Sequence, residues 1–144
     1  MKKGFTLMEL IIVVVIIGIL AMVGLPQFFR VAERGRSAEA IAALGALRSA
    51  ELRFAAETNS TTNVATNLDM DVPGITPNTP ALRFFTITFG NPVNPNTNPT
   101  AVVARAQRNN VSNSYGNYIL HIQADGVFFC TGGANNICDL VTPK

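Results

Sequence analysis

The sequence predicts an α+β fold in which a long N-terminal helix, first transmembrane and then amphipathic, packs on a small antiparallel sheet of three or four strands. Three observations lead to this prediction. No residue from Leu10 to Leu25 carries a polar side chain. Apolar residues then recur at helical spacing as far as Glu57, and beyond residue 80 they alternate as in strands. One helix on one sheet is a stable layer arrangement, and 144 residues suffice for one such domain.

The composition argues against several classes of protein. Only 14% of the residues are charged, against about 25% in a typical soluble domain, so a disordered tail or a solvated repeat is disfavoured. Lys2 and Lys3 account for the formal net charge of +2, which leaves the rest of the chain without an electrostatic surface for nucleic acid. Two cysteines and one histidine argue against a multi-ligand metal site. We expect no metal and no cofactor.

Residues 5–25 have the length and polarity of a membrane span. As a helix they would extend about 31 Å, close to the thickness of a bilayer's hydrocarbon core. Lys2 and Lys3 are expected to stay cytoplasmic, so the rest of the chain crosses the membrane. A secretory signal peptide is the alternative, because it too has a basic start before an apolar run. The length of the run and the acid Glu9 within the apolar segment favour a retained anchor.

Glu9 is the unusual residue of this segment. The apolar side chains from Leu10 to Leu25 favour insertion by about 4–7 kcal/mol in total, whereas a charged carboxylate costs about 3 kcal/mol. An acid at this position is expected to have a partner, and no basic residue follows within one helical turn. Cleavage between Gly4 and Phe5 would create an α-amine that is positive near neutral pH. In a neighbouring copy of the chain, that amine could pair with Glu9.

The segment Gly4-Phe5-Thr6-Leu7-Met8-Glu9-Leu10, with the apolar run and Leu25-Pro26-Gln27-Phe28 after it, resembles the amino terminus of type IV pilins and pseudopilins. The resemblance implies that a prepilin peptidase cleaves after Gly4 and methylates the amine of Phe5. It also implies that Glu9 pairs with this amine on an adjacent subunit. Gly18 and Pro26 would mark a weak segment that bends or unwinds in a filament; an ordinary proline kink is the alternative.

The implied function is that of a non-enzymatic structural subunit of a bacterial type IV pilus, serving adhesion, twitching motility or DNA uptake. The implied partners are further copies of the chain, the prepilin peptidase, the inner-membrane assembly machinery and, before assembly, membrane lipid. The subunit would lie in the inner membrane first and in an extracellular pilus afterwards. The implied boundaries are a leader at 1–4, a filament-core segment at 5–29, an amphipathic segment at 30–57 and a head at 58–144.

Three alternatives stay open. A type II secretion pseudopilin shares the amino terminus, but the chain has no tryptophan, and Tyr115-Gly116-Asn117-Tyr118 matches the usual pseudopilin segment poorly. A minor pilin at the filament tip is the second alternative. A membrane-anchored periplasmic binding module that never polymerises is the third.

The rest of the chain predicts the helix–sheet pair. One helical face shares small or apolar residues, namely Ala40, Ala43, Leu44, Leu47, Ala50 and Phe54. A long loop is expected from Thr58 to Pro80. Strands are expected at 82–89, 101–108, 117–123 and 127–130, with a hairpin turn at Asp125-Gly126.

A few polar residues of the head could carry chemistry. Export to an oxidising compartment predicts a disulfide between Cys130 and Cys138, with two free thiols as the alternative, and the pilin resemblance supports the disulfide. Asp69 and Asp71 together with Asp125 or Asp139 could bind calcium, although scattered acids are usually loop residues. His121 alternates within a predicted strand and is expected to be an inert strand residue.

Overall fold

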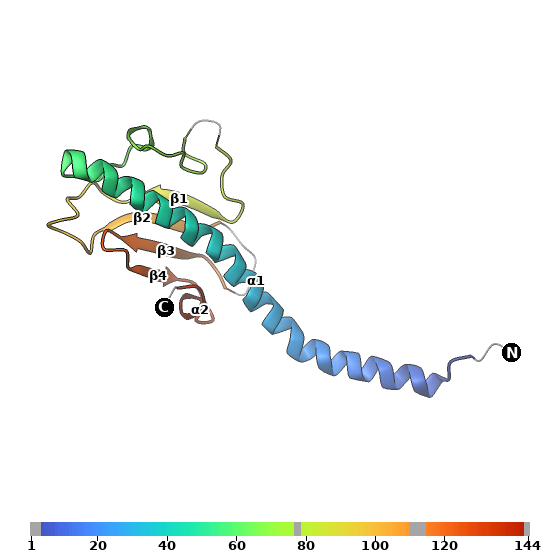
Figure 1. The fold of residues 1–144 in the computed structure, drawn as a ribbon. Coiled ribbons are helices and arrows are strands. Elements are labelled where there is room, and N and C mark those ends of the chain that lie inside the picture. The colour runs from blue at the N-terminus through green and yellow to red at the C-terminus, as the bar shows by residue number, and fades with distance from the viewer. Residues whose placement is uncertain (1–3, 77–78, 110–114, 143–144) are drawn as a thin grey trace. The chain divides into compact units, whose positions relative to one another are not determined.

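The computed structural model describes residues 4–76, 79–109 and 115–142. Figure 1 shows its elements along the chain. They are α1 (Leu7–Thr58), the short 3-10 helix η1 (Ala65–Asn67), β1 (Phe85–Phe89), β2 (Val102–Arg108), β3 (Tyr118–Gln123), β4 (Phe128–Gly132) and α2 (Ile137–Val141). The chain divides into two compact units, Met1–Glu33 and Arg34–Lys144, and α1 contributes to both.

The second unit contains a four-stranded antiparallel sheet in the order β1-β2-β3-β4. Each strand therefore pairs with the strand that follows it in sequence. One row across the sheet runs from Ile87 through Ala106 and Leu120 to Cys130. Ile87, Ala106 and Leu120 are buried and Cys130 is half-buried, so this row lies on the inner face of the sheet. The predicted antiparallel sheet is confirmed.

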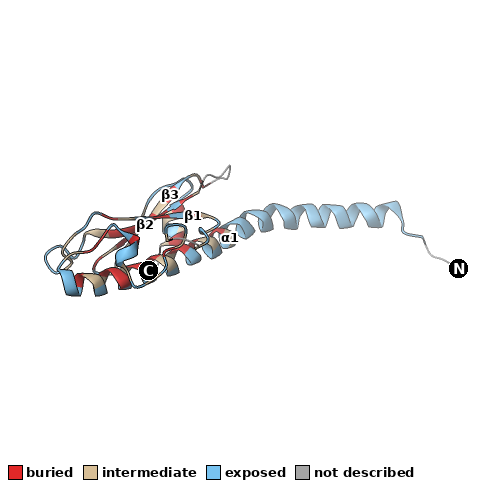
Figure 2. Ribbon diagram, turned by 90° about the horizontal axis from the view of Figure 1, so that it is seen from above, coloured by how far each residue is buried: buried red, intermediate tan, exposed pale blue. Residues whose placement is uncertain are grey.

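The part of α1 in the second unit covers this inner face (Figure 1). Ala40, Leu44 and Leu47 are fully buried in one core with side chains of the sheet. Their spacing of three and four residues places them on one stripe of the helix, as the sequence predicts. Figure 2 shows buried residues on this part of α1, with exposed residues between them. Burying each large apolar side chain contributes about 1.5–3 kcal/mol, so this stripe holds the helix on the sheet.

The predicted hairpin turn lies between β3 and β4. Gly126 has a φ of 96°, which favours glycine, and its N–H donates to the carbonyl of Gln123 at 3.0 Å. The Asp125 carboxylate accepts from the N–H of Val127 at 2.9 Å. Arg48 on α1 donates from Nε to the carbonyl of Ala124 at 2.9 Å and so ties the helix to this turn.

The strand boundaries differ most from the prediction at the start of β1 and at the end of β4, while β2, β3 and β4 each begin one residue later than predicted. β1 begins at Phe85 instead of residue 82. The carbonyl of Phe84 accepts from the N–H of Asn109 at 2.8 Å and from Nη1 of Arg108 at 3.0 Å, so the regular pairing with β2 ends there. β4 covers Phe128–Gly132 instead of 127–130, because pairing with β3 continues to Gly132.

Two short helices were not predicted. η1 lies inside the connection expected to be an irregular loop, and α2 follows β4 near the end of the described chain. α2 has only five residues, which is too short for a helical period to stand out. It packs beside β4 and carries the buried side chains of Ile137 and Val141.

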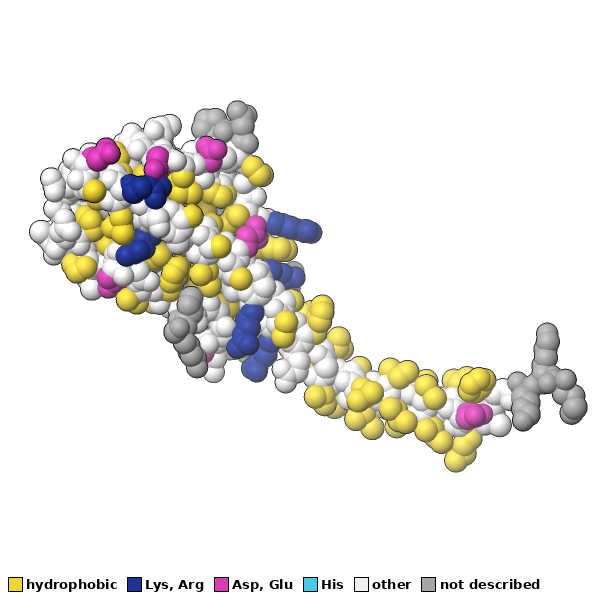
Figure 3. All heavy atoms as spheres, in the orientation of Figure 1, with side chains coloured by type: hydrophobic (Ala, Val, Ile, Leu, Met, Phe, Trp, Pro, Cys, Tyr) yellow, Lys and Arg dark blue, Asp and Glu magenta, His cyan; other side chains and the backbone are white. Residues whose placement is uncertain are grey.

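The first unit contains the amino-terminal part of α1. Its large apolar side chains from Phe5 to Val31 are 48% to 81% exposed. Figure 3 shows hydrophobic side chains all along this part of the helix, with backbone atoms between them. α1 is long and apolar enough to cross a membrane, with a mean hydropathy of 2.9 in its most apolar stretch.

Candidate functional site

The residues predicted to act in processing and assembly lie at the start of the first unit. Gly4, Phe5 and Thr6 are exposed and non-helical, and α1 begins at Leu7. The peptide bond between Gly4 and Phe5 therefore lies outside the helix. Residues 1–3, which complete the predicted leader, lie outside the described residues. Exposed, irregular backbone of this kind is where proteolysis usually occurs.

Glu9 has a partner that the sequence prediction did not name. Its Oε2 accepts from the backbone N–H of Thr6 at 3.2 Å and from the Thr6 hydroxyl at 3.2 Å. In return, the N–H of Glu9 donates to Oγ1 of Thr6 at 3.3 Å. These reciprocal contacts form a capping box, which satisfies backbone donors at the first turn of a helix. The T-x-x-E spacing before an apolar run is its sequence signal, so Thr6 was identifiable from the sequence.

The two carboxylate oxygens of Glu9 differ in their contacts. Both bonds from Thr6 end on Oε2, and in the part of the chain that the structure describes Oε1 accepts no hydrogen bond. Glu9 is exposed, with the apolar side chains of Met8 and Leu10 on either side of it in sequence. One oxygen is therefore held by the capping box, while the other is available to a donor from outside the chain.

Gly18 and Pro26 lie within an uninterrupted helix. α1 continues through both residues, although glycine lowers helix propensity and proline removes one backbone donor. A Cβ added at Gly18 or Gly24 would meet nothing within 4 Å. Packing inside the chain therefore does not require these glycines. The bending or unwinding of this segment in a filament stays a prediction.

Comparison with known families identifies this amino terminus. Residues 1–25 match the family described as the prokaryotic N-terminal methylation motif. The chain carries a type IV prepilin motif.

Several characterised proteins are similar to part of this chain. The type IV major pilin protein PilA of Myxococcus xanthus is 46% identical over 56 residues, which are 39% of this chain and 26% of that protein. A fimbrial protein of Pseudomonas aeruginosa is 47% identical over 49 residues, 34% of this chain and 32% of that one. The type IV narrow pilus major component of Thermus thermophilus is 48% identical over 48 residues, 33% and 41% of the two chains.

The chain thus matches between 26% and 41% of the length of these three relatives. No solved structure matches the chain significantly. The prepilin motif and the α+β architecture are the features that the chain shares with type IV pilins.

In the second unit, Cys130 and Cys138 form a disulfide, with their Cα atoms 5.2 Å apart. It links β4 to α2 and closes a largely exposed loop. Gly133 in this loop has a φ of 79°, and an added Cβ would clash with the buried Ile137 side chain. A glycine is therefore required there.

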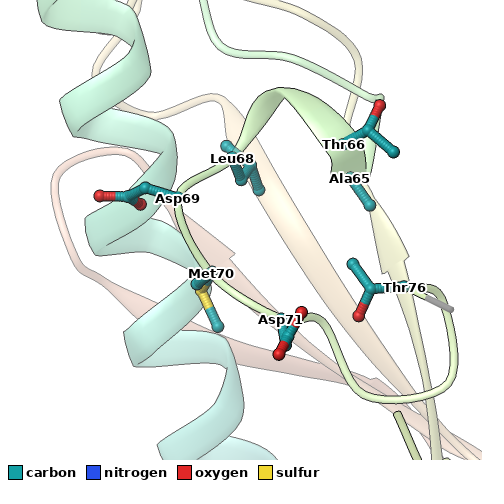
Figure 4. Close-up of a pocket in the computed structure, with 7 residues that line it drawn as sticks. All are labelled: Ala65, Thr66, Leu68, Asp69, Met70, Asp71 and Thr76. Carbon is teal, nitrogen blue, oxygen red and sulfur yellow. The ribbon is translucent and has the colours of Figure 1, made fainter. Parts of the chain in front are cut away.

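The aspartates considered for calcium do not form a metal site in the described chain. The connection from α1 to β1 lines a pocket of about 390 Å³. Figure 4 shows its lining residues, with Asp69 and Asp71 among them. Asp69 is bound by Arg53 at 2.6 Å, and Asp125 accepts the amide of its own turn. Among the described residues, no three His, Cys, Asp or Glu side chains are grouped to hold a metal ion.

His121 lies on β3 as a packed strand residue. Its ring stacks on Phe129, with centroids 4.5 Å apart and planes 3° apart, and its Nε2 lies 2.8 Å from Oγ1 of Thr131. Burial and, to a smaller extent, the charge of Arg105 lower the pKa of His121.

Glu51 is a buried acid that the sequence prediction missed. Its side chain is inaccessible to solvent, and its Oε2 accepts from the N–H of Thr62 at 2.8 Å. Its Oε1 has no hydrogen-bond partner among the described residues. Burial raises the pKa of Glu51 to about 7, and the bond from Thr62 partly opposes this shift. The sequence signal for its burial was its position four residues after Leu47, in phase with the buried stripe of α1.

Proposed function

We propose that this chain is a structural, non-enzymatic subunit that polymerises into a bacterial type IV pilus. The observation that carries the proposal is the exposed apolar helix of the first unit. This helix begins with a prepilin motif, in which Glu9 forms a capping box with Thr6. The names of the relatives, which are major pilin and fimbrial proteins, favour a pilus subunit over a secretion pseudopilin.

The apolar surface of α1 must be shielded from water both before assembly and in the filament. From Phe5 to Val31 its large side chains are about half exposed or more, and soluble monomers rarely expose a surface of this extent. Before assembly, lipid of the inner membrane covers it. In the filament, the equivalent helices of neighbouring subunits replace the lipid, and the heads lie outside this helical bundle.

Glu9 and Phe5 supply the specific contact between subunits. Cleavage after Gly4 by the prepilin peptidase frees the amine of Phe5, which then receives its methyl group. Two opposite charges at about 4 Å attract by about 4 kcal/mol at an effective dielectric constant near 20. An amine without a partner in an apolar core is penalised, so a subunit enters the filament only where its amine meets Glu9 of a neighbour.

The proposed path of the subunit follows from these contacts. The inner-membrane assembly machinery extracts the processed subunit, whose residues 5–29 form the filament core and whose residues 30–57 connect the core to the head at 58–144. The pilus is extracellular. Adhesion, twitching motility and DNA uptake are roles of the whole filament, and the subunit geometry favours none of them.

The decisive experiment is electron microscopy of filaments sheared from the cell surface, with mass spectrometry of their main component. The proposal expects thin filaments that consist mainly of this chain and that disappear when its gene is deleted and return on complementation. Cells that produce the chain in the membrane but place none of it in surface filaments would contradict the proposal. Loss of protein secretion on deletion, with no loss of surface filaments, would indicate a pseudopilin instead.

A further inference from the structure

The contacts around Glu9 separate its two oxygens into an internal and an external acceptor. Thr6 occupies Oε2 with two donors, its backbone N–H and its hydroxyl, both at 3.2 Å. Oε1 accepts nothing within the described chain. A glutamate has three side-chain torsions, and fixing them costs entropy when the side chain must meet a partner. The capping box fixes them before a neighbouring subunit arrives.

We propose that Thr6 is the positioning residue for the contact between subunits, because it holds Oε2 of Glu9 and leaves Oε1 for the incoming amine of Phe5. This inference rests on the proposed function of Glu9 in filament assembly. The role belongs to the hydroxyl in particular. Any residue at position 6 supplies a backbone N–H, but only a hydroxyl both donates to the carboxylate and accepts the N–H of Glu9.

The apolar surroundings strengthen this role. The residues next to Glu9 in sequence expose apolar side chains, and in lipid or in a helical bundle no water replaces a lost hydrogen bond. The amide and hydroxyl of Thr6 take the place of water at Oε2. A preorganised acceptor loses less freedom on binding than a mobile one, so Thr6 raises the affinity of each assembly step without contacting the neighbour.

A purely structural cap is the competing explanation. In that case Thr6 would only hold the first turn of α1, and its loss would fray the helix without a specific effect on assembly. Two variants distinguish these explanations. Thr6→Val keeps the shape of the side chain and removes the hydroxyl, whereas Thr6→Ser keeps the hydroxyl and removes the methyl group. Thr88→Val is the matched control, since Thr88 is an exposed residue of β1 in the second unit.

Each variant is expressed as the only copy of the chain, and the yield of sheared filaments is divided by the amount of subunit in the membrane. Loss of a hydroxyl at a helix start costs about a five- to tenfold change in equilibrium. We expect Thr6→Val to lower the normalised yield by at least this factor, while Thr6→Ser and Thr88→Val stay near wild type. Intact mass must show the same processed amino terminus at Phe5 in every variant, because Thr6 is the second residue after the cleaved bond.

A competition experiment tests whether Thr6 acts through Glu9. Tagged variants are co-expressed with the wild-type chain, and their fraction in filaments is measured relative to the membrane. We expect the variant with both Thr6→Val and Glu9→Gln to enter filaments as rarely as Glu9→Gln alone. A wild-type yield from Thr6→Val, a Thr6→Ser yield as low as that of Thr6→Val, or additive losses in the double variant would each overturn the positioning role. Absence of filaments from the wild-type chain would instead contradict the proposed function on which this role rests.

Discussion

Arg53 and Asp69 form a two-point ion pair that joins α1 to the connection before β1. Nε of Arg53 donates to Oδ2 of Asp69 at 2.6 Å, and Nη2 donates to Oδ1 at 2.6 Å. Both side chains are more than half exposed. The hydrogen bonds to Arg53 lower the pKa of Asp69 below its ordinary value, and the same contact raises the pKa of Arg53. The pair fixes one point of a connection that otherwise has little regular structure.

We predict that Asp69→Asn loosens this connection while the second unit remains folded. The backbone amides of residues 65–72 should exchange faster with deuterium, and the melting temperature should fall by no more than a few degrees because exposed pairs contribute little to stability. Since the folded pKa of Asp69 is lowered, the contribution is present above the ordinary aspartate pKa and is lost as the pH falls below about 4. Asp71→Asn, on the same connection, is the control. Unchanged exchange in Asp69→Asn would mean that other contacts hold this segment.

We predict that Glu51 gives the free energy of unfolding a pH dependence opposite to that from Asp69. Burial raises the pKa of Glu51 from 4.5 to about 7, so between these values the folded chain binds more protons than the unfolded chain. The free energy of unfolding therefore falls as the pH rises through this window, by about 2 kcal/mol between pH 5 and pH 8. Glu51→Gln should remove this slope and make the head more stable than wild type at pH 8.

Urea unfolding of the detergent-solubilised chain measures the effect of Glu51→Gln. Tyrosine fluorescence reports on the head, because both tyrosines, Tyr115 and Tyr118, are buried there. Glu57→Gln, exposed near the end of α1, serves as the control and should keep the wild-type slope. Identical slopes for Glu51→Gln and wild type would contradict a raised pKa at Glu51.

We predict that the disulfide moderately stabilises the head against unfolding. Closing so short a loop between Cys130 and Cys138 stabilises the fold by about 2.5 kcal/mol in the chain-entropy model. Replacing both cysteines by serine should lower the stability of the head by a similar amount and leave membrane insertion unchanged. Peptide mapping without reductant should recover the linked pair from isolated filaments. Free thiols at both positions in freshly isolated material would count against the bond in the native protein.

The prepilin motif predicts a mature chain that begins at Phe5 and carries one methyl group on its amine. The Gly4–Phe5 bond is exposed and lies outside α1, so it needs no unfolding of the helix to reach a peptidase. Intact-mass analysis of the membrane-bound and filament forms measures this directly. An amino terminus at Met1, or one beyond Leu20, would contradict processing at this bond.

Glu9→Gln is predicted to abolish or sharply reduce filaments while the subunit remains in the membrane with a folded head. Glutamine keeps the size of the side chain and its hydrogen bonding to Thr6, but it removes the charge that attracts the amine of Phe5. Insertion should survive because the apolar run outweighs even a charged carboxylate. Filament yield and membrane levels are measured together, with Glu39→Gln on the exposed side of α1 as a charge-matched comparison. Normal filaments from Glu9→Gln would rule out charge pairing as the assembly contact.

The sequence predicted those parts of the fold that follow from periodicity. The stripe at Ala40, Leu44 and Leu47 and the turn at Asp125-Gly126 have strong local signals, and the structure confirms both. The start of β1 has no such signal, because it depends on hydrogen bonds to a carbonyl before the strand from Arg108, the last residue of β2, and from Asn109, just after β2. These bonds join segments far apart in sequence.

The candidate site was predicted in its residues but only partly in its contacts. The charge of Glu9 directed attention to a cationic partner, so its local bonds with Thr6 were missed even though their spacing is a known helix-start signal. Glu51 was missed because burial of an acid depends on tertiary packing, and a polar residue within an apolar stripe is normally assigned to the surface.

Each strand of the sheet pairs with the strand before it in the chain, and this order suits vectorial folding. When the head is exported in chain order behind an amino-terminal anchor, each strand that emerges after β1 can pair with an edge that has already formed. At each step only the connection to the preceding strand has to close, which favours rapid folding. Cys138 emerges after all four strands, so we expect oxidation to lock a sheet that is already complete instead of directing its formation.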